Sequence, residues 1–162
     1  MADPIVTPRT LQVEHIKIET AKKFADVEPA LERSVPQLDP ALAEALVKGD
    51  EQRATELERG EPLFIFLKRN HGALLQVAGR PRKALQYDIG NPHTATKMTR
   101  HQVAAGLYAP LRVFLYEDEK GHAIFEYDKP SSLFGQFGDE QVSAVARGLD
   151  AALERALRRA AE

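Results

Sequence analysis

Residues 111–127, LRVFLYEDEKGHAIFEY, contain the clearest structural signal in the chain. Apolar and aromatic residues dominate 111–116 and again 123–127, and the polar run between them ends in a glycine. Two such segments around a short polar turn predict a β-hairpin. The chain is therefore expected to contain an antiparallel sheet, which the elements on either side would extend.

Three upstream segments predict further strands. Residues 63–67 are continuously apolar, and the short run after Pro62 favours a buried strand over a helix. Apolar residues occupy alternate positions over 84–89, which is typical of a strand with one buried face. The alternation over 11–19 is less regular, and it predicts the first strand.

Helical spacing is present in the first third of the chain. Apolar residues recur at intervals of three and four over 24–35, but Pro29 lies within this segment and predicts a kink or a break. Asp39 followed by Pro40 predicts an N-cap and a first helical residue. Further helical turns are expected over 50–59.

Two more helices are expected in the second half. Asn91 and Pro92 predict a helix start directly after a strand, and this helix is expected to run to about residue 105. Asp139 predicts the N-cap of a last helix of about 33 Å, long enough to cross a whole sheet. The segment 130–138 is expected to be a loop.

The order strand, helix, four strands and long helix predicts an α+β fold. It has an antiparallel-rich sheet with helices packed on one face. The chain of 162 residues suits one domain, which we place at 11–162 with a helical insertion at 36–60. The first ten residues lack periodicity and predict a loose N-terminal arm.

Composition excludes several classes of protein. The chain has no cysteine, which excludes disulfides, a thiol nucleophile and thiolate metal sites. Its longest apolar run is far shorter than the roughly 20 residues that span a bilayer, so no membrane partner is expected. The first residues do not resemble a signal peptide, and a cytoplasmic location is predicted. The histidines lack metal-ligand spacing, and we predict neither a metal nor a cofactor.

Charge is distributed unevenly. Residues 68–101 hold seven Lys or Arg and one acid, whereas 1–62 and 102–162 are both acidic. A basic middle segment indicates either an anion site or a surface that pairs with the acidic segments. Nucleic acid is not an expected partner, because the chain carries a net charge of −2 and Tyr87 is the one aromatic residue of the basic segment.

The helix start after residue 90 is a candidate ligand site. The backbone N–H groups of the first turn, together with Asn91, His93, Thr94 and Lys97, are suited to a carboxylate or phosphate. The alternative is a plain strand-to-helix connection with ordinary capping.

Two other positions have chemical potential. His71 follows a buried strand, where an imidazole can act as a general base or simply fix a turn. Tyr127 is expected to lean over a pocket, beside a Glu126 that pairs with Arg112 across two strands.

Four motifs in order resemble the bacterial and archaeal family called domain of unknown function 302. The resemblance extends over about residues 11–157 and implies a strand–helix–four-strand–helix fold of the TATA-binding-protein-like type, often dimeric. It implies no known reaction. The chain departs from the family pattern at Asn70, where Asp is common, and in its polar segment 36–60. The motifs are Leu67-Lys68-Arg69-Asn70-His71-Gly72, Gly90-Asn91-Pro92, Tyr108-Ala109-Pro110-Leu111-Arg112-Val113 and Glu126-Tyr127-Asp128-Lys129-Pro130-Ser131-Ser132.

These observations favour a binding module for a small anionic ligand, held in a hollow that His71 shares with the Asn91 turn. The first alternative is an enzyme, a hydrolase or lyase, with His71 as its general base. The second is a structural or protein-interaction domain that uses an exposed sheet face. A homodimer is expected from the resemblance.

Overall fold

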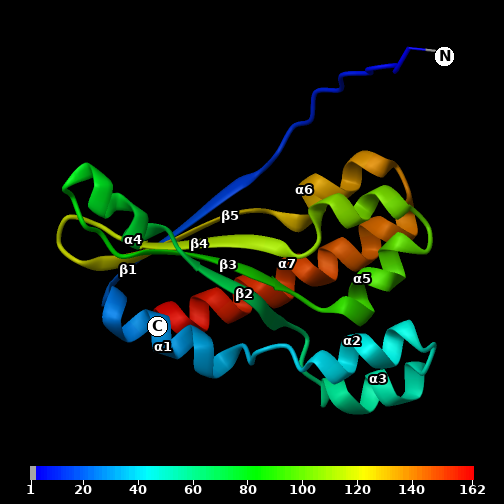
Figure 1. Ribbon diagram of the computed structural model, residues 1–162, viewed down its shortest axis with the longest axis horizontal. Coiled ribbons are helices and arrows are strands. Elements are labelled where there is room, and N and C mark those ends of the chain that lie inside the picture. The colour runs from blue at the N-terminus through cyan, green and yellow to red at the C-terminus, as the bar shows by residue number, and fades with distance from the viewer. Residues whose placement is uncertain (1–2) are drawn as a thin grey trace.

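The computed structural model describes residues 3–162, which form a five-stranded sheet with helices (Figure 1). Each neighbouring pair of strands is antiparallel. The predicted α+β class with an antiparallel-rich sheet is confirmed. In spatial order the strands are β1 (His15–Lys23), β5 (His122–Asp128), β4 (Leu111–Glu117), β3 (Ala84–Gly90) and β2 (Phe64–Asn70).

Two helices cover one face of the sheet and enclose the hydrophobic core. They are α1 (Phe24–Ser34) and α7 (Glu140–Ala161), and α7 runs along the sheet as its 22 residues predict (Figure 1). Asp139 caps α7, as expected, by accepting bonds from two backbone N–H groups of its first turn. The core side chains that are completely buried include Val27, Leu31, Tyr87, Val113, Leu115, Phe125, Leu153 and Leu157.

Shorter helices lie at the ends of the sheet. The helices α2 and α3 pack against each other near α5 (Figure 1), within the segment 36–60 for which the insertion stays a prediction. Asp39 begins α2, because its carboxylate accepts a bond of 2.9 Å from the backbone N–H of Ala41. The short elements are α2 (Pro40–Val47), α3 (Glu51–Glu58), α4 (His71–Leu74), η1 (Leu75–Ala78), α5 (Pro92–Thr99), η2 (Val103–Tyr108), α6 (Pro130–Phe134) and η3 (Gly135–Phe137).

Pro29 does not break α1, contrary to one predicted outcome. The helix continues through it, and Val27 and Leu31 on either side are completely buried. Their packing outweighs the one backbone bond that a proline removes, since tertiary contacts supply most of a helix's stability. The first strand also begins later than predicted. Its register pairs His15 with Asp128, the last residue of β5, so residues 11–14 have no partner strand.

Two boundaries in the second half differ from those predicted. Helix α5 ends at Thr99, and the extended backbone of Gln102 separates it from η2. The predicted loop at 130–138 contains α6 and η3, with Pro130 at the first helical position that suits its fixed φ. A proline that reads as a loop residue thus begins a helix.

Residues 3–14 have no regular secondary structure and extend away from the sheet (Figure 1). Arg9 donates a bond of 2.7 Å to Gln136. Met1 and Ala2 of the predicted arm lie outside the described residues, and the division into arm and domain stays a prediction.

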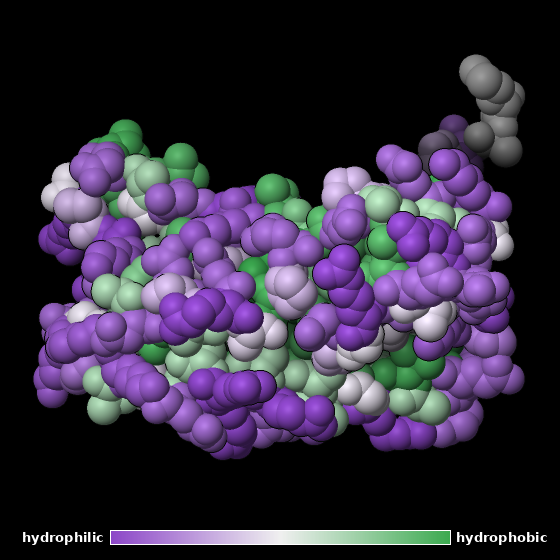
Figure 2. Space-filling view, turned by 90° about the horizontal axis from the view of Figure 1, so that it is seen from below, coloured by the Kyte–Doolittle hydropathy of each residue, from purple (hydrophilic) through white to green (hydrophobic). Residues whose placement is uncertain are grey.

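The described helices include none that combines the length and the apolar composition needed to cross a membrane. Seen from below, the molecule is mostly hydrophilic, and hydrophobic residues form small patches between the polar ones (Figure 2).

Candidate functional site

The prediction that His71 and Asn91 share a hollow is wrong, because the two residues lie at opposite ends of the β2–β3 strand pair. His71 follows Asn70, which pairs with Leu85, whereas Asn91 follows Gly90 at the other end of β3. Seven residues at a rise of about 3.3 Å separate the two ends by about 20 Å. A small ligand does not reach both groups.

Asn91 is occupied as the N-cap of α5. Its side-chain oxygen accepts bonds from the backbone N–H groups of His93 at 2.9 Å and Thr94 at 3.2 Å. These are the donors that an anion would use at a helix start. Asn91 and Thr94 also line a hollow of about 190 Å³ with an apolar lining. The geometry therefore favours the capping alternative.

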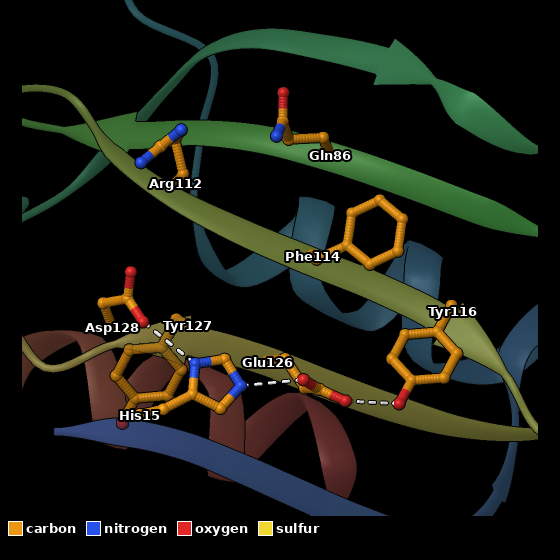
Figure 3. A pocket seen from close by; sticks show the side chains of 8 residues that line it. All are labelled: His15, Gln86, Arg112, Phe114, Tyr116, Glu126, Tyr127 and Asp128. Atoms are coloured by element: carbon orange, nitrogen blue, oxygen red, sulfur yellow. Dashed lines mark hydrogen bonds and ion pairs between the residues drawn. The ribbon is translucent and has the colours of Figure 1, made fainter. Parts of the chain in front are cut away.

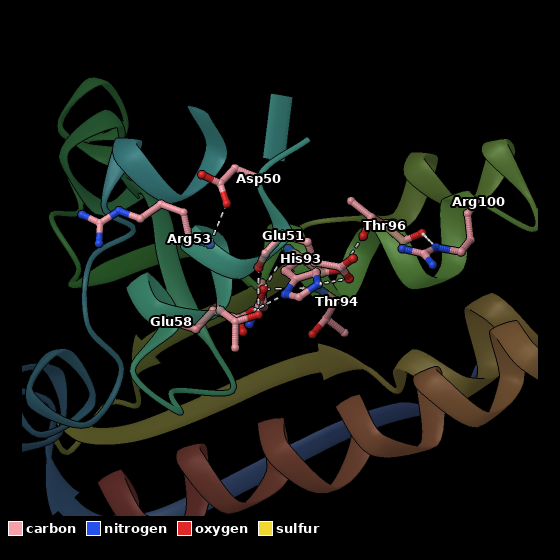
Figure 4. Close-up of polar contacts among 10 residues, drawn as sticks. Asp50, Glu51, Arg53, Glu58, His93, Thr94, Thr96 and Arg100 are labelled. Atoms are coloured by element: carbon pink, nitrogen blue, oxygen red, sulfur yellow. Dashed lines mark hydrogen bonds and ion pairs between the residues drawn. The ribbon is translucent and has the colours of Figure 1, made fainter. Parts of the chain in front are cut away.

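His93 connects α5 to α3 of the helical insertion (Figure 4). Its Nε2 lies 3.0 Å from a carboxylate oxygen of Glu51, and its Nδ1 lies 3.3 Å from Glu58. The His93 side chain is 7% exposed. The bond from His93 lowers the pKa of Glu51. This arrangement holds the insertion in place, while the neighbouring Lys97 is exposed on α5.

His71 lies on the other side of the sheet from α1 and α7, at the rim of the uncovered face. Its ring stands edge-on to Phe114, with 5.6 Å between the ring centroids. Asn70 caps α4 by accepting a bond of 2.9 Å from the N–H of Ala73, a role that Asp fulfils equally well. The general-base role of His71 stays a prediction.

Alternate residues of the strands form the uncovered face, which we call the open face. Side chains from β1, β3, β4 and β5 surround a hollow of about 490 Å³ there (Figure 3). Tyr127 contributes to its lining, but this side chain belongs to the core and burial raises its pKa to about 12. The other lining residues are His15, Gln86, Arg112, Phe114, Tyr116, Glu126 and Asp128.

Four polar side chains form a continuous chain across this hollow (Figure 3). The two ring nitrogens of His15 lie 2.9 Å from Asp128 and 2.7 Å from Glu126. The Tyr116 hydroxyl donates to the other oxygen of Glu126. These bonds lower the pKa of Glu126, and those from Asp128 and Glu126 raise the pKa of His15.

The predicted pair between Glu126 and Arg112 is wrong. Across the strands Glu126 faces Phe114, and both of its oxygens are taken by His15 and Tyr116. Arg112 instead faces Asp88.

A second hollow of about 550 Å³ adjoins the first, since Gln86, Arg112 and Asp128 line both. Within it Arg69 forms an ion pair with Asp88, with 2.9 Å between nitrogen and oxygen. Arg112, by contrast, has no ion-pair partner among residues 3–162. Its side chain is exposed and lines both hollows, and Figure 3 shows it in the first of them. It is the guanidinium best placed to receive an external anion.

The sequence reasoning did not select His15, Gln86, Phe114 or Tyr116. A usable signal was present in β4, because polar or aromatic residues alternate there with aliphatic ones. Side chains two residues apart share a face of a strand, so Arg112, Phe114 and Tyr116 had to point the same way.

Comparison with known proteins agrees with the resemblance seen in the sequence. The model of the family described as domain of unknown function DUF302 matches residues 51–160. A crystal structure of the uncharacterized conserved protein DUF302 from Bacillus stearothermophilus is similar, with a TM-score of 0.66 and 16% identity over 90% of this chain and 97% of that one. This likeness concerns the fold. No curated protein matches the chain.

Proposed function

The chain belongs to the family described as domain of unknown function DUF302, and we propose that it binds a small anionic molecule at Arg112 on the open face. One observation carries the proposal: this exposed guanidinium lies between two hollows without an ion-pair partner in residues 3–162. A guanidinium offers paired N–H donors that match the two oxygens of a carboxylate or the oxygens of a phosphate.

The proposal keeps the ligand class expected from the sequence and moves the site. The helix start at Asn91 is capped by its own side chain, and His93 is hydrogen-bonded through Nε2 to Glu51 of α3. Arg112 on the open face, by contrast, forms no ion pair within residues 3–162. This face also offers Gln86, whose amide is able to donate and accept hydrogen bonds beside Arg112.

The neighbouring charges are held by one another, and this supports Arg112 as the anchor. Asp88 is paired with Arg69, and Asp128 and Glu126 share the single imidazole of His15. Arg112 therefore offers an incoming anion a guanidinium that forms no ion pair within residues 3–162, and the anion need not displace an existing pair.

Binding of anions to the Arg112→Gln variant tests the proposal. Acetate, sulfate and phosphate are titrated while backbone amide NMR signals are followed. The signals of β4 and β5 near Arg112 are expected to shift in the wild type and to stay unchanged in the variant. Arg155→Gln, on the exposed side of α7, is the matched control and should behave as the wild type. Equal binding by wild type and Arg112→Gln would contradict the proposal.

A second copy of the chain is the proposed macromolecular partner, as the family resemblance implies. Exposed apolar residues on the projecting α4–η1 segment support it, since Leu74 is 69% and Val77 is 94% exposed. Light scattering should give twice the monomer mass of 18.0 kDa, and Val77→Ser should reduce it. A monomer mass at all protein concentrations would contradict the proposed homodimer. The cytoplasmic location and the TATA-binding-protein-like assignment stay predictions.

A further inference from the structure

The surroundings of Arg112 differ on its two sides. The first hollow combines the polar side chains of His15, Glu126 and Asp128 with the aromatic rings of Phe114 and Tyr116. The second hollow is lined partly by polar side chains of the sheet, among them Arg69 and Asp88, and partly by an apolar wall that η2, the connection into β4 and α6 supply. The residues of this wall are Leu107, Tyr108, Ala109, Pro110, Leu111 and Leu133. A ligand held by Arg112 and lying in the second hollow therefore contacts apolar surface with the rest of its body.

Leu107 has the most exposed side chain of this wall. Its side chain is 80% exposed at the side of the hollow, although the transfer of a leucine side chain out of water is favourable. The hollow of about 550 Å³ lies within the range of about 300–1,000 Å³ that small-molecule sites occupy. A ligand with an apolar body would cover Leu107 and fill this space.

The charges near Arg112 limit the charge of the ligand. Asp88 faces Arg112 across the strands, and Asp128 lines the same hollow. One guanidinium without a partner neutralises one negative charge. A second negative charge on the ligand would lie close to these two carboxylates, and like charges repel at such distances. The site therefore fits a monoanion better than a dianion.

We propose that the ligand is a monocarboxylate with an apolar body, its carboxylate on Arg112 and its body against Leu107, Pro110 and Leu133. This inference rests on the proposed function, and it adds the chemical class of the ligand. A carboxylate forms two parallel hydrogen bonds with a guanidinium, which fixes the direction in which the body extends.

Four probes separate the charge of the ligand from its body. They are 3-phenylpropionate, acetate, 3-phenylpropionamide and sulfate, titrated against the whole chain with amide NMR signals as the readout. We expect 3-phenylpropionate to bind about tenfold more tightly than acetate, because burial of a phenyl group adds favourable contact. The neutral amide and the dianion sulfate should bind more weakly than 3-phenylpropionate.

Substitutions on η2 locate the body of the ligand. Leu107→Ser should reduce the affinity ratio of 3-phenylpropionate to acetate by about fivefold, since an apolar contact is lost. Val103→Ser is the matched control, because Val103 is 84% exposed on the same short helix and does not line either hollow. This control should leave the affinity ratio unchanged. Both variants should fold, because the Leu107 and Val103 side chains are already exposed in the wild type.

The possible outcomes distinguish this inference from the proposed function. Sulfate binding at Arg112 more tightly than 3-phenylpropionate, or a ratio that Leu107→Ser does not change, would overturn the monocarboxylate and leave anion binding in place. If no probe produces a shift that depends on Arg112, both proposals fall. Tight, Leu107-dependent binding of the monocarboxylate supports both.

Discussion

The two faces of the sheet are built from the same strands and differ in almost every other respect. In β4, Val113 and Leu115 are completely buried beneath α1 and α7, whereas Arg112, Phe114 and Tyr116 point to the open face. Successive side chains of a strand point to opposite faces. Stability and the proposed recognition are thus separated by a single position along the chain, and substitutions of adjacent residues should affect them separately.

The largest contrast is expected between Leu115 and its neighbour Phe114. Leu115→Ala should lower the free energy of unfolding by about 2–5 kcal/mol, because it leaves a cavity in a close-packed core. Phe114→Ala should lower it less, since this ring is half-buried and water replaces it. Urea unfolding of both variants measures the difference. Equal losses would mean that the open face is covered in solution, as a second copy of the chain would do.

Gly72 tests the point where the chain leaves β2 and enters α4. A Cβ at this position would lie 2.0 Å from the backbone oxygen of Arg82. We expect Gly72→Ala to lower the free energy of unfolding by about 1–3 kcal/mol through overpacking. Gly135→Ala is the matched control, because it has open space around it and a helical φ of −61°. A near-neutral Gly72→Ala would show that the backbone near Arg82 gives way.

The two faces can also be compared by removing one tyrosine hydroxyl from each. Tyr87 on the covered face donates a bond of 2.8 Å to Glu32, and Tyr116 on the open face donates to Glu126. Tyr87→Phe should lower the free energy of unfolding by about 1–2 kcal/mol, since a buried bond to a charged group is lost. Tyr116→Phe should lower it by less, because the Tyr116 side chain is half-buried whereas that of Tyr87 is completely buried. Thermal or urea unfolding checks the order, and the reverse order would contradict it.

The smallest effect concerns His15 and pH. Its two carboxylate partners raise its pKa above 6.5, so its contribution to stability is present below about pH 6.5 and is lost as the pH rises through the raised pKa. The group is exposed, and the contribution should stay under about 1 kcal/mol. NMR titration of the imidazole should give a pKa that falls in Glu126→Gln. An unchanged pKa in this variant would mean that the bond to Glu126 is not formed in solution.

Much of the fold was predictable because short-range rules determine it. Asp39 and Asp139 were recognisable as N-caps, and the hairpin of β4 and β5 follows from its apolar strands and polar turn. Pro29 shows the limit of such rules. Its effect depends on how well α1 packs against the sheet, and local sequence does not contain that information.

The candidate site was less predictable for a different reason. Asn91 was expected either to cap α5 or to help bind an anion, and the same residues, Asn91 and Pro92, are compatible with both roles. His71 and Asn91 lie twenty residues apart, and the register of β2 against β3 decides that they do not meet. His15 was harder still to find, because it is far along the chain from its partners Glu126 and Asp128. Side-chain alternation predicts which face a residue occupies, but it does not predict which strands are neighbours.

The segment that leads into α2 has a consequence for how the molecule behaves at high concentration. Ile65 in the outermost strand β2 donates to the carbonyl of Pro36 at 2.8 Å and accepts from the N–H of Leu38 at 2.9 Å. Those groups are no longer free to template the addition of a foreign strand. Farther along β2 the charged side chains of Lys68 and Arg69 continue this protection. The start of segment 36–60 thus protects part of the β2 edge of the sheet against pairing with a foreign strand.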